Sequence, residues 1–260
     1  MNARKTVIIT GSSQGIGEAT AILFSKKGFN VVLHGRNKEK LESAKKNCEL
    51  AGAPGVLAVE LELSNQADLT RLIRDTVAEF GGIDVLVNNA AFGQFDNLED
   101  MDSERLDKIF AVNVKAPILL TKAAIPHLKK SRGAIVNISS FASGIRTNKL
   151  MSYAITKAAL DQFSLILSGN YAPDGVRVNT IRPASVATDF AGTTGIPKET
   201  IEKMTKAKAA KHPLAGLLKP EEVAQAIWMC CDPEMPSLTG QNITIHGGRI
   251  EDTPWVNPFD

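Results

Sequence analysis

The chain has 260 residues, and its 30 Lys and Arg against 28 Asp and Glu leave a formal net charge of only +2. So small a charge provides no strong field for recruiting polyanions, which disfavours a nucleic-acid binder. Hydrophobic residues make up 43% of the chain and charged residues 22%, which excludes disordered, coiled-coil and collagen-like proteins and allows a full core.

Cysteines and histidines bear on compartment and metals. Cys48, Cys230 and Cys231 form no even framework and no Cys-x-x-Cys pair, so the sequence predicts neither a disulfide scaffold nor a zinc ribbon. The four histidines lack ligand spacing, and we expect no metal site. No apolar run approaches the roughly 18 residues of a spanning helix, and no signal-peptide core is present. We therefore expect a soluble, cytoplasmic protein.

Short runs rich in Val, Ile and Leu predict seven strands, at 6–10, 30–33, 55–59, 83–87, 134–138, 176–181 and 242–245. Continuous apolar runs are typical of a parallel sheet covered on both faces. Between them, apolar residues at three- and four-residue spacing predict helices at 15–27, 38–51, 66–80, 103–130, 152–171 and 220–231. Ser64 is expected to cap the third helix, and Pro220 to lie in the first turn of the last.

Alternating strands and helices with right-handed crossovers predict an α/β fold, a doubly wound Rossmann-type domain with a seven-stranded parallel sheet and helices on both faces. We expect one dinucleotide-binding and catalytic domain over 1–250 and a C-terminal tail at 251–260. The stretch 184–217 lacks a strand partner. It is either a lid over the substrate or a surface excursion without function.

The first strand is joined to the first helix by Thr10-Gly11-Ser12-Ser13-Gln14-Gly15-Ile16-Gly17. Glycines there permit a tight turn and a close approach to a phosphate, and the N–H groups that open the helix attract an anion. The spacing differs from Gly-x-Gly-x-x-Gly, and no Gly-Lys-Ser/Thr follows, which disfavours an ATPase. Alone, the motif fits either a dinucleotide site or an ordinary strand-turn-helix bend.

The end of the second strand bears on the choice of cofactor. In dinucleotide folds an acid there selects NAD, whereas an arginine accommodates the extra phosphate of NADP. The residues are His34-Gly35-Arg36-Asn37, with no acid before Glu39. Arg36 therefore favours NADP(H) over NAD(H) and weighs against a methyltransferase, unless it is only a solvated loop cation.

Tyr153 and Lys157 open a helix four residues apart, and hence lie on one face. A phenol with a pKa near 10 is a good proton carrier at neutrality only if a cation stabilises its anion by about three pKa units, roughly 4 kcal/mol. One ammonium about 4 Å away supplies energy of that order. Such pairs more often serve packing and solubility, so their context decides.

The sequence resembles the short-chain dehydrogenase/reductase family from Val7 to about Gly248. Each motif is weak alone, but all occur in the family's order and approximate spacing. They are the glycine loop, Asn88-Asn89-Ala90, Asn113, Ser139-Ser140 and the Tyr153/Lys157 pair.

This resemblance implies a catalytic set. Tyr153 would be the general acid/base at the substrate oxygen, and Lys157 would lower the pKa of Tyr153 and bind the nicotinamide ribose. Ser140, thirteen positions before Tyr153, would hold the carbonyl oxygen in preference to Ser139. Asn113 would anchor a water that relays protons to Lys157, although it could also be only a helix kink or cap.

The resemblance also implies cofactor contacts, with departures. Glu62-Leu63 stands where the family usually has Asp and an apolar residue for adenine, Arg182-Pro183-Ala184 replaces the usual Asn-Pro-Gly, and Gln14 stands where many NADP-dependent members carry a basic residue. The expected cofactor-binding residues are Gly11, Ser12, Ser13, Gln14, Gly15, Ile16, Gly17, Arg36, Asn37, Glu62, Leu63, Asn89, Ala90, Tyr153, Lys157, Pro183, Val186 and Thr188.

Side chains after strand ends or beside the catalytic set predict the substrate pocket. They are Ser140, Tyr153, Phe92, Phe95, Phe141, Met151 and Phe190, and they favour an apolar or amphipathic substrate. Lysines between 198 and 211 would attract an acidic carrier or a phosphorylated substrate, or form the solvated face of an amphipathic helix.

We therefore predict an NADP(H)-dependent oxidoreductase that transfers a hydride between nicotinamide and a ketone or secondary alcohol, with no nucleic-acid or membrane partner. The resemblance implies a homo-oligomer, a dimer or a tetramer, that pairs the helices 103–130 and 152–171. Two alternatives stay open. One is a catalytically silent dinucleotide-binding sensor or scaffold, and the other is a dehydratase or epimerase on the same fold.

Overall fold

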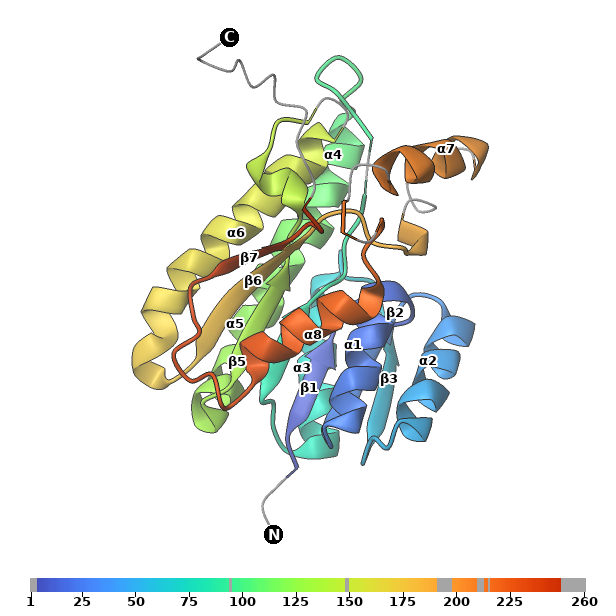
Figure 1. Ribbon diagram of the computed structural model, residues 1–260. Helices are drawn as coiled ribbons and strands as arrows, with labels where there is room; N and C mark the ends of the chain where they lie inside the picture. Colours follow the sequence, from blue (N-terminus) through green and yellow to red (C-terminus); the bar gives the residue numbers. More distant parts are fainter. Residues whose placement is uncertain are drawn as a thin grey trace.

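The computed structural model describes residues 4–93, 95–147, 150–190, 198–209, 213–214 and 216–248. In this part of the chain, parallel strands form one sheet in the order β3-β2-β1-β4-β5-β6-β7 (Figure 1). The seven expected strands and the doubly wound fold are confirmed. The bounds are Thr6–Ile9 (β1), Asn30–Gly35 (β2), Val56–Glu60 (β3), Val85–Asn88 (β4), Ala134–Ile138 (β5), Arg177–Pro183 (β6) and Asn242–Ile245 (β7).

The strand order reverses at β1. Ile8 lies opposite Val32 of β2 on one side and opposite Leu86 of β4 on the other. Every residue of β1 is buried, which explains its continuous apolar run. Because the chain leaves β1 and β4 toward opposite halves of the sheet, a crevice opens beyond their carboxyl ends, where doubly wound sheets bind ligands.

Helices cover both faces of the sheet (Figure 1). One core lies between the sheet and α1, α2 and α8 and includes Phe24, Leu41 and Ile227. The other includes Leu72 of α3 and Leu120 of α5. The helices span Gly15–Lys26 (α1), Lys38–Leu50 (α2), Gln66–Phe80 (α3), Ser103–Phe110 (α4), Ala116–Ser131 (α5), Met151–Tyr171 (α6), Lys198–Ala209 (α7) and Pro220–Cys231 (α8).

Three local features differ from the expectations. The cap of α3 is Asn65, whose side chain accepts the N–H of Ala67 at 3.0 Å, and not Ser64, because Asn65 directly precedes the first helical residue. The helix expected over 103–130 contains a π-helical turn, Ala111–Lys115, between α4 and α5. The stretch 184–217 contains α7 and joins the next segment through a bridge between Val186 and Leu218. The tail at 251–260 lies outside the described residues.

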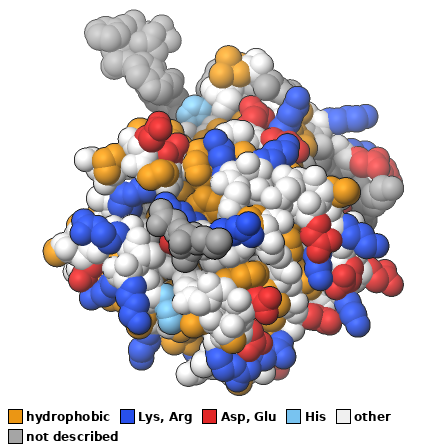
Figure 2. All heavy atoms as spheres, turned by 90° about the horizontal axis from the view of Figure 1, so that it is seen from below, with side chains coloured by type: hydrophobic (Ala, Val, Ile, Leu, Met, Phe, Trp, Pro, Cys, Tyr) orange, Lys and Arg blue, Asp and Glu red, His pale blue; other side chains and the backbone are white. Residues whose placement is uncertain are grey.

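The continuous helical stretch Ser103–Ser131 is long and apolar enough to cross a membrane by length and composition, although we expected no such stretch from the sequence. Half of its most apolar window is buried inside the protein, as in the core helix of a soluble protein. The face at the amino ends of the strands carries acidic and basic side chains with hydrophobic ones between them (Figure 2).

Candidate active site

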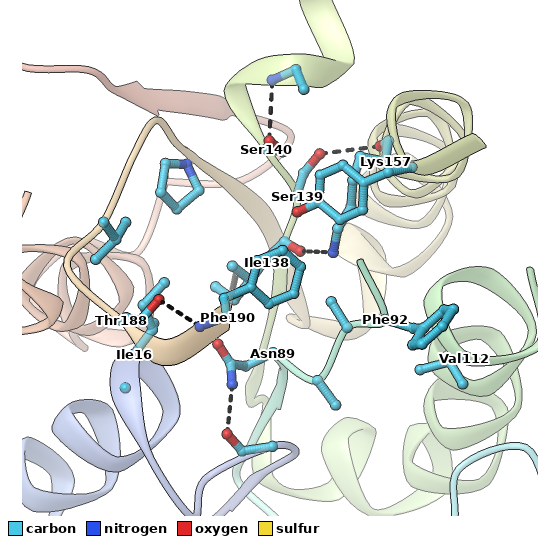
Figure 3. A pocket seen from close by; sticks show the side chains of 18 of the residues that line it. Ile16, Asn89, Phe92, Val112, Ile138, Ser139, Ser140, Lys157, Thr188 and Phe190 are labelled. Carbon is cyan, nitrogen blue, oxygen red and sulfur yellow. Dashed lines mark hydrogen bonds between the residues drawn. The ribbon is translucent and has the colours of Figure 1, made fainter. Parts of the chain in front are cut away.

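A cavity of about 630 Å³ lies beyond the carboxyl ends of β1 to β6 (Figure 3). Most of the side chains that the sequence predicted for a cofactor and a substrate meet there, although they come from distant parts of the chain. The predicted residues that line it are Gly11, Ser13, Gln14, Gly15, Ile16, Arg36, Glu62, Leu63, Asn89, Ala90, Phe92, Ser140, Phe141, Tyr153, Lys157, Pro183, Val186, Thr188 and Phe190.

The glycine loop packs too tightly for side chains at two of its positions. Gly11 has a φ of +64°, and a Cβ there would lie 2.9 Å from the Cα of Ala90. A Cβ on Gly17 would lie 2.3 Å from the carbonyl oxygen of Gly11. The amide of Asn89 donates to the carbonyl oxygens of Thr10 and Gly11 at 2.9 and 3.0 Å. Asn89 therefore stabilises this loop conformation.

The first turn of α1 lines the cavity. Gln14 is the N-cap residue, but its side chain makes no cap hydrogen bond and instead accepts the ammonium of Lys40. Ser13, Gly15 and Ile16 line the cavity beside it. N–H groups at the positive end of a helix favour an anion such as a pyrophosphate.

His34 lies beneath the glycine loop and is 3% exposed. Its Nδ1 accepts the backbone N–H of Gly11 at 3.0 Å, and its Nε2 lies 3.3 Å from the carbonyl oxygen of Leu61. This arrangement assigns the proton to Nε2, because Nδ1 must carry a free lone pair. Burial lowers the pKa of His34 to about 4, which keeps the ring neutral near pH 7.

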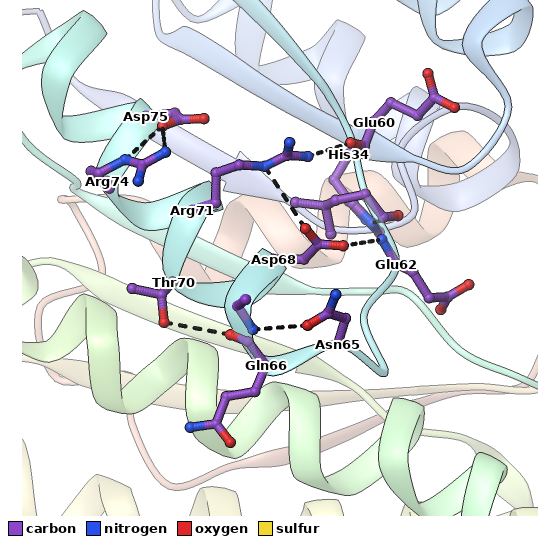
Figure 4. Close-up of polar contacts among 12 residues, drawn as sticks. His34, Glu60, Glu62, Asn65, Gln66, Asp68, Thr70, Arg71, Arg74 and Asp75 are labelled. Atoms are coloured by element: carbon purple, nitrogen blue, oxygen red, sulfur yellow. Dashed lines mark hydrogen bonds and ion pairs between the residues drawn. The ribbon is translucent and has the colours of Figure 1, made fainter.

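Arg36 and Glu62 face each other at the β2 and β3 end of the cavity. Arg36 Nη1 lies 3.5 Å from Glu62 Oε2, and both side chains are substantially exposed. Asp68 of α3 accepts the backbone N–H of Glu62 at 3.1 Å and so orders this connection (Figure 4). An ion pair this exposed contributes little to stability, so Arg36 can exchange Glu62 for another anion at small cost.

Tyr153 and Ser140 line the cavity together. Ser140 precedes a 3-10 turn, Phe141–Gly144, and its hydroxyl accepts the N–H of Ala142 at 3.1 Å (Figure 3). Burial raises the pKa of Tyr153 to about 12, and the polar side chain of Ser140 opposes that shift. The neighbouring Ser139 instead donates to the carbonyl oxygen of Lys157 at 3.1 Å. Ser140 therefore differs from Ser139 in facing the cavity with a hydroxyl that is not bonded to Lys157.

Lys157 is 2% exposed, and its Nζ donates to the carbonyl oxygen of Ile138 at 2.7 Å (Figure 3). The same Nζ lies 5.6 Å from the centroid of the Tyr153 ring. Burial lowers the pKa of Lys157 to about 8, and the carboxylate of Asp161 opposes the shift. We expected Lys157 to lower the pKa of Tyr153. The pKa instead rises, because burial penalises the phenolate more than the polar contacts favour it.

Asn113 lies in the π-helical turn and is fully buried. Its amide donates to the carbonyl oxygen of Phe92 at 3.0 Å and to Thr156 Oγ1 at 3.1 Å, and its Oδ1 accepts the N–H of Phe92 at 2.8 Å. Single π-helical turns often occur at functional sites. Through these bonds the π-helical turn connects Phe92, in the loop after β4, to Thr156 of α6. Thr156 directly precedes Lys157.

A family model described as "Enoyl-(Acyl carrier protein) reductase" matches residues 11–249. The chain belongs to the short-chain dehydrogenase/reductase family. It is 34% identical to 3-oxoacyl-[acyl-carrier-protein] reductase FabG of Thermotoga maritima over 248 residues, which cover 95% of this chain and 98% of that protein.

Two solved structures of this family are also similar. One, a short-chain dehydrogenase/reductase of Caenorhabditis elegans with cofactor, shares 36% identity with a TM-score of 0.88, over 94% of each chain. The other, 3-ketoacyl-(acyl-carrier-protein) reductase of Brucella melitensis complexed with NADH, shares 31% identity with a TM-score of 0.86, over 94% of this chain and 98% of that one. Like its relatives, this short-chain dehydrogenase/reductase is an oxidoreductase of the nicotinamide-dependent type.

Some residues expected in the site of this short-chain dehydrogenase/reductase do not line the cavity. Ser12 is buried and bonds to Ile9 and His34 in the strand layer, and Gly17 packs against the loop. The side chain of Asn37 caps α2 by accepting the N–H of Lys40. The other three outside the cavity wall are Asn113, Phe95 and Met151. Several of these residues thus support the loops and helices that carry the lining.

The structure also adds lining residues that the sequence analysis did not single out for the site. They include His34, Lys108, Val112, Ile138, Ser139 and Arg146. For Val112 and Ser139 a signal existed, because each directly precedes a predicted site residue. No local pattern indicated His34 or Lys108, whose positions depend on how strands and helices pack. Among the described residues, no three His, Cys, Asp or Glu side chains gather as a metal site would require.

Proposed function

We propose that the protein is an NADP(H)-dependent carbonyl reductase in which Tyr153 delivers the proton to the substrate oxygen. The observation that carries this proposal is that Tyr153 and Ser140 line the same cavity as the glycine loop, with Ser140 close enough to lower the pKa of Tyr153. A carbonyl oxygen beside both hydroxyls would receive two hydrogen bonds, which stabilise the negative charge that develops during reduction.

The residues around the cavity fit a dinucleotide. The N–H groups of the first turn of α1 would face the pyrophosphate, and Arg36 the phosphate on the adenosine ribose. Lys157, Pro183 and Thr188 line the same cavity and would hold the nicotinamide half. Reduced nicotinamide supplies a hydride, which would form the new C–H bond at the carbonyl carbon and leave the cofactor oxidised.

Tyr153 is protonated before the reaction. Burial raises its pKa to about 12, so at neutral pH the phenol carries the proton that it would donate. The alkoxide that reduction would generate is a far stronger base than a phenolate, so the proton moves downhill from Tyr153 to the new alcohol oxygen. We propose reduction of a ketone as the favoured direction, because cells generally keep the proposed cofactor, NADP(H), in its reduced form.

The relatives support a carbonyl substrate. The matched Thermotoga maritima protein is named a 3-oxoacyl reductase, and a 3-oxoacyl group contains a ketone. Phe92, Phe141 and Phe190 line the same cavity, and the rings of Phe190 and Tyr153 lie 5.8 Å apart. We propose that these rings hold an apolar part of the substrate, and that 184–217 closes over it as a lid, since Thr188, Phe190 and Thr205 reach the cavity from that stretch.

A single substitution tests the catalytic assignment. NADPH oxidation is measured with a panel of ketones for the wild type, for Tyr153→Phe and for the control Tyr171→Phe at the far end of α6. We expect Tyr153→Phe to lower kcat/KM by about 100- to 10,000-fold and the control to retain activity. Equal rates in all three proteins contradict the role of Tyr153. NADPH binding without turnover would instead favour a sensor, and turnover without a net change in nicotinamide absorbance a dehydratase or epimerase.

The cofactor preference has its own test. Dissociation constants of NADPH and NADH are measured for the wild type, for Arg36→Ala and for Arg74→Ala, an exposed arginine of α3 outside the cavity wall. We expect the wild type to prefer NADPH. Arg36→Ala should weaken NADPH binding by about tenfold or more, with little change for NADH. Tighter binding of NADH by the wild type overturns the preference.

We also propose that the protein is a homo-oligomer in the cytoplasm. Ile118 of α5 and Ile155, Leu165 and Ile166 of α6 are between 37% and 51% exposed, and these two helices belong to the pair that the family resemblance implies for the oligomer. Light scattering after size exclusion tests this proposal: a monomer at micromolar concentration contradicts it. The buried, free cysteines are compatible with a reducing compartment.

A further inference from the structure

Charge is distributed unevenly around the cavity. Among the described lining residues the only carboxylate is that of Glu62, at the end of the cavity where Arg36 would meet the adenosine ribose. The lining also includes Lys108, and it includes Arg146 in the segment between Ser140 and Tyr153. The described lining therefore carries two positive charges that the proposed cofactor contacts do not use.

Lys108 lies in the last turn of α4, and its ammonium lies 5.1 Å from the centroid of the Phe92 ring. Phe92 and Val112, one helical turn after Lys108, line the cavity as well. In the described part of the chain Lys108 forms no ion pair. The contact with Phe92 therefore keeps the ammonium beside the cavity without neutralising its charge.

Arg146, the second cation, belongs to a different part of the chain. It lies in the segment that leads from Ser140 to Tyr153, just after the 3-10 turn Phe141–Gly144. Its neighbours Ile145 and Thr147 line the cavity with it, and it too forms no ion pair within the described residues. The two cations come from different elements, α4 and the segment before α6.

Several apolar side chains line the same cavity. They include Phe92, Ile145, Leu150 and Phe190. A substrate with a short apolar stem would fill this region, with its carbonyl at one end. Lys108 and Arg146 are exposed to solvent as well as to the cavity, and they would favour an anionic group through charge-assisted hydrogen bonds that salt weakens.

We propose that the substrate is a ketone that carries an anionic group, such as a carboxylate, which Lys108 and Arg146 bind while Ser140 and Tyr153 hold the carbonyl oxygen. This inference rests on the proposed carbonyl reductase activity and narrows its substrate class. The hydride and the Tyr153 proton convert the ketone to a secondary alcohol. The anionic group takes no part in bond making.

The test uses pairs of ketones that differ only in charge. Rates of NADPH oxidation are measured for acetoacetate, levulinate and longer linear keto acids, each beside its methyl ester. We expect at least one acid to have a kcat/KM about tenfold or more above that of its ester, mainly through KM. Raising the ionic strength toward about 1 M should reduce this ratio, because the Debye length falls to about 3 Å.

Variants assign the preference to the two cations. Lys108→Gln and Arg146→Gln should each lower the acid-to-ester ratio of kcat/KM by about tenfold, and the double variant should bring it close to unity. Lys122→Gln removes an equal charge from an exposed position of α5 outside the cavity wall and should leave the ratio unchanged. The dissociation constant of NADPH, measured for each variant, shows that the fold and the cofactor end are intact.

The outcomes separate this inference from the function on which it rests. If ketones are reduced but acids and esters react equally well throughout the series, the substrate class is wrong and the reductase stands. A preference for acids that persists in the double variant also overturns the roles of Lys108 and Arg146. If no ketone of either kind is reduced while NADPH binds, the reductase proposal fails first, and this inference fails with it.

Discussion

The Nδ1 atom of His34 accepts the backbone N–H of Gly11 at 3.0 Å, which joins the end of β2 to the glycine loop after β1. The backbone reinforces this link, because Ser12 N–H donates to the carbonyl oxygen of His34 at 2.9 Å and the His34 N–H donates to Ser12 Oγ at 2.9 Å. A neutral imidazole thus stabilises the loop that would bind a pyrophosphate.

This buried histidine should make folding stability depend on pH. The pKa of His34 is about 4 in the folded protein and 6.5 as its ordinary value, so the unfolded state takes up the proton first as the pH falls. The contribution of His34 is therefore fully present above pH 6.5 and is lost between pH 6.5 and about 4. We expect a loss of about 3 kcal/mol in the free energy of unfolding across this range.

Urea unfolding at several pH values measures the slope of the free energy of unfolding against pH. His34→Gln, which cannot titrate, should flatten it, whereas His127→Gln, a substitution of a partly exposed histidine of α5, should not. An unchanged slope in His34→Gln would show that other groups dominate the acid sensitivity of the protein.

Asp96 should be needed to place Tyr153. Its carboxylate accepts the backbone N–H of Ser152 at 3.1 Å and also the Ser152 hydroxyl, directly before Tyr153 in α6. Asp96→Ala leaves both buried donors without that acceptor, so we expect a loss of about 2 kcal/mol in stability. Activity should fall through kcat more than through KM, since the misplaced phenol acts in the transition state.

The matched control is Asp102→Ala. Asp102 also accepts an N–H at a helix start, that of Glu104 in α4, but it is exposed. Its loss should cost about 1 kcal/mol of stability with kcat retained. A kcat in Asp96→Ala that equals the wild-type value would argue against a positioning role.

Glu62 should weaken NADPH binding, since its carboxylate lies 3.5 Å from the guanidinium proposed to bind the extra phosphate. Glu62→Gln removes the competing anion. We therefore expect NADPH to bind about threefold to tenfold more tightly and NADH to change less. Fluorescence titration measures both, with Glu60→Gln as the control, an exposed acid at the end of β3 outside the cavity wall. Equal gains for both cofactors would point to a general charge effect.

Substitutions of Asp161 and Arg182 should shift the pH above which kcat/KM declines, and they should shift it in opposite directions. Asp161 is buried, raises the pKa of Lys157, and is paired with Arg182 Nη2 at 2.7 Å. Asp161→Asn should lower the pKa of Lys157 below about 8, so kcat/KM declines at lower pH. Arg182→Met leaves the Asp161 charge unopposed and should shift the decline to higher pH. Shifts in the same direction would indicate a structural effect of the broken pair.

The arrangement of strands and helices could be read from the sequence because the signals are local. The buried run of β1 and the helical spacing of α1 involve neighbouring residues, and both elements lie within two residues of their predicted bounds. Tyr153 and Lys157 share a helix face for the same reason, since four residues span about one turn. Family motifs then placed most of the cavity lining at the ends of the strands.

Features that depend on packing between distant segments were not accessible in this way. Nothing near His34 in the sequence indicates that its ring accepts the N–H of Gly11, and nothing near Lys108 indicates a position beside Phe92. The pKa of Tyr153 shows the same limit. The spacing to Lys157 predicted a lower value, but the balance of burial against charge attraction is set by every atom around the phenol, and in the folded protein burial dominates.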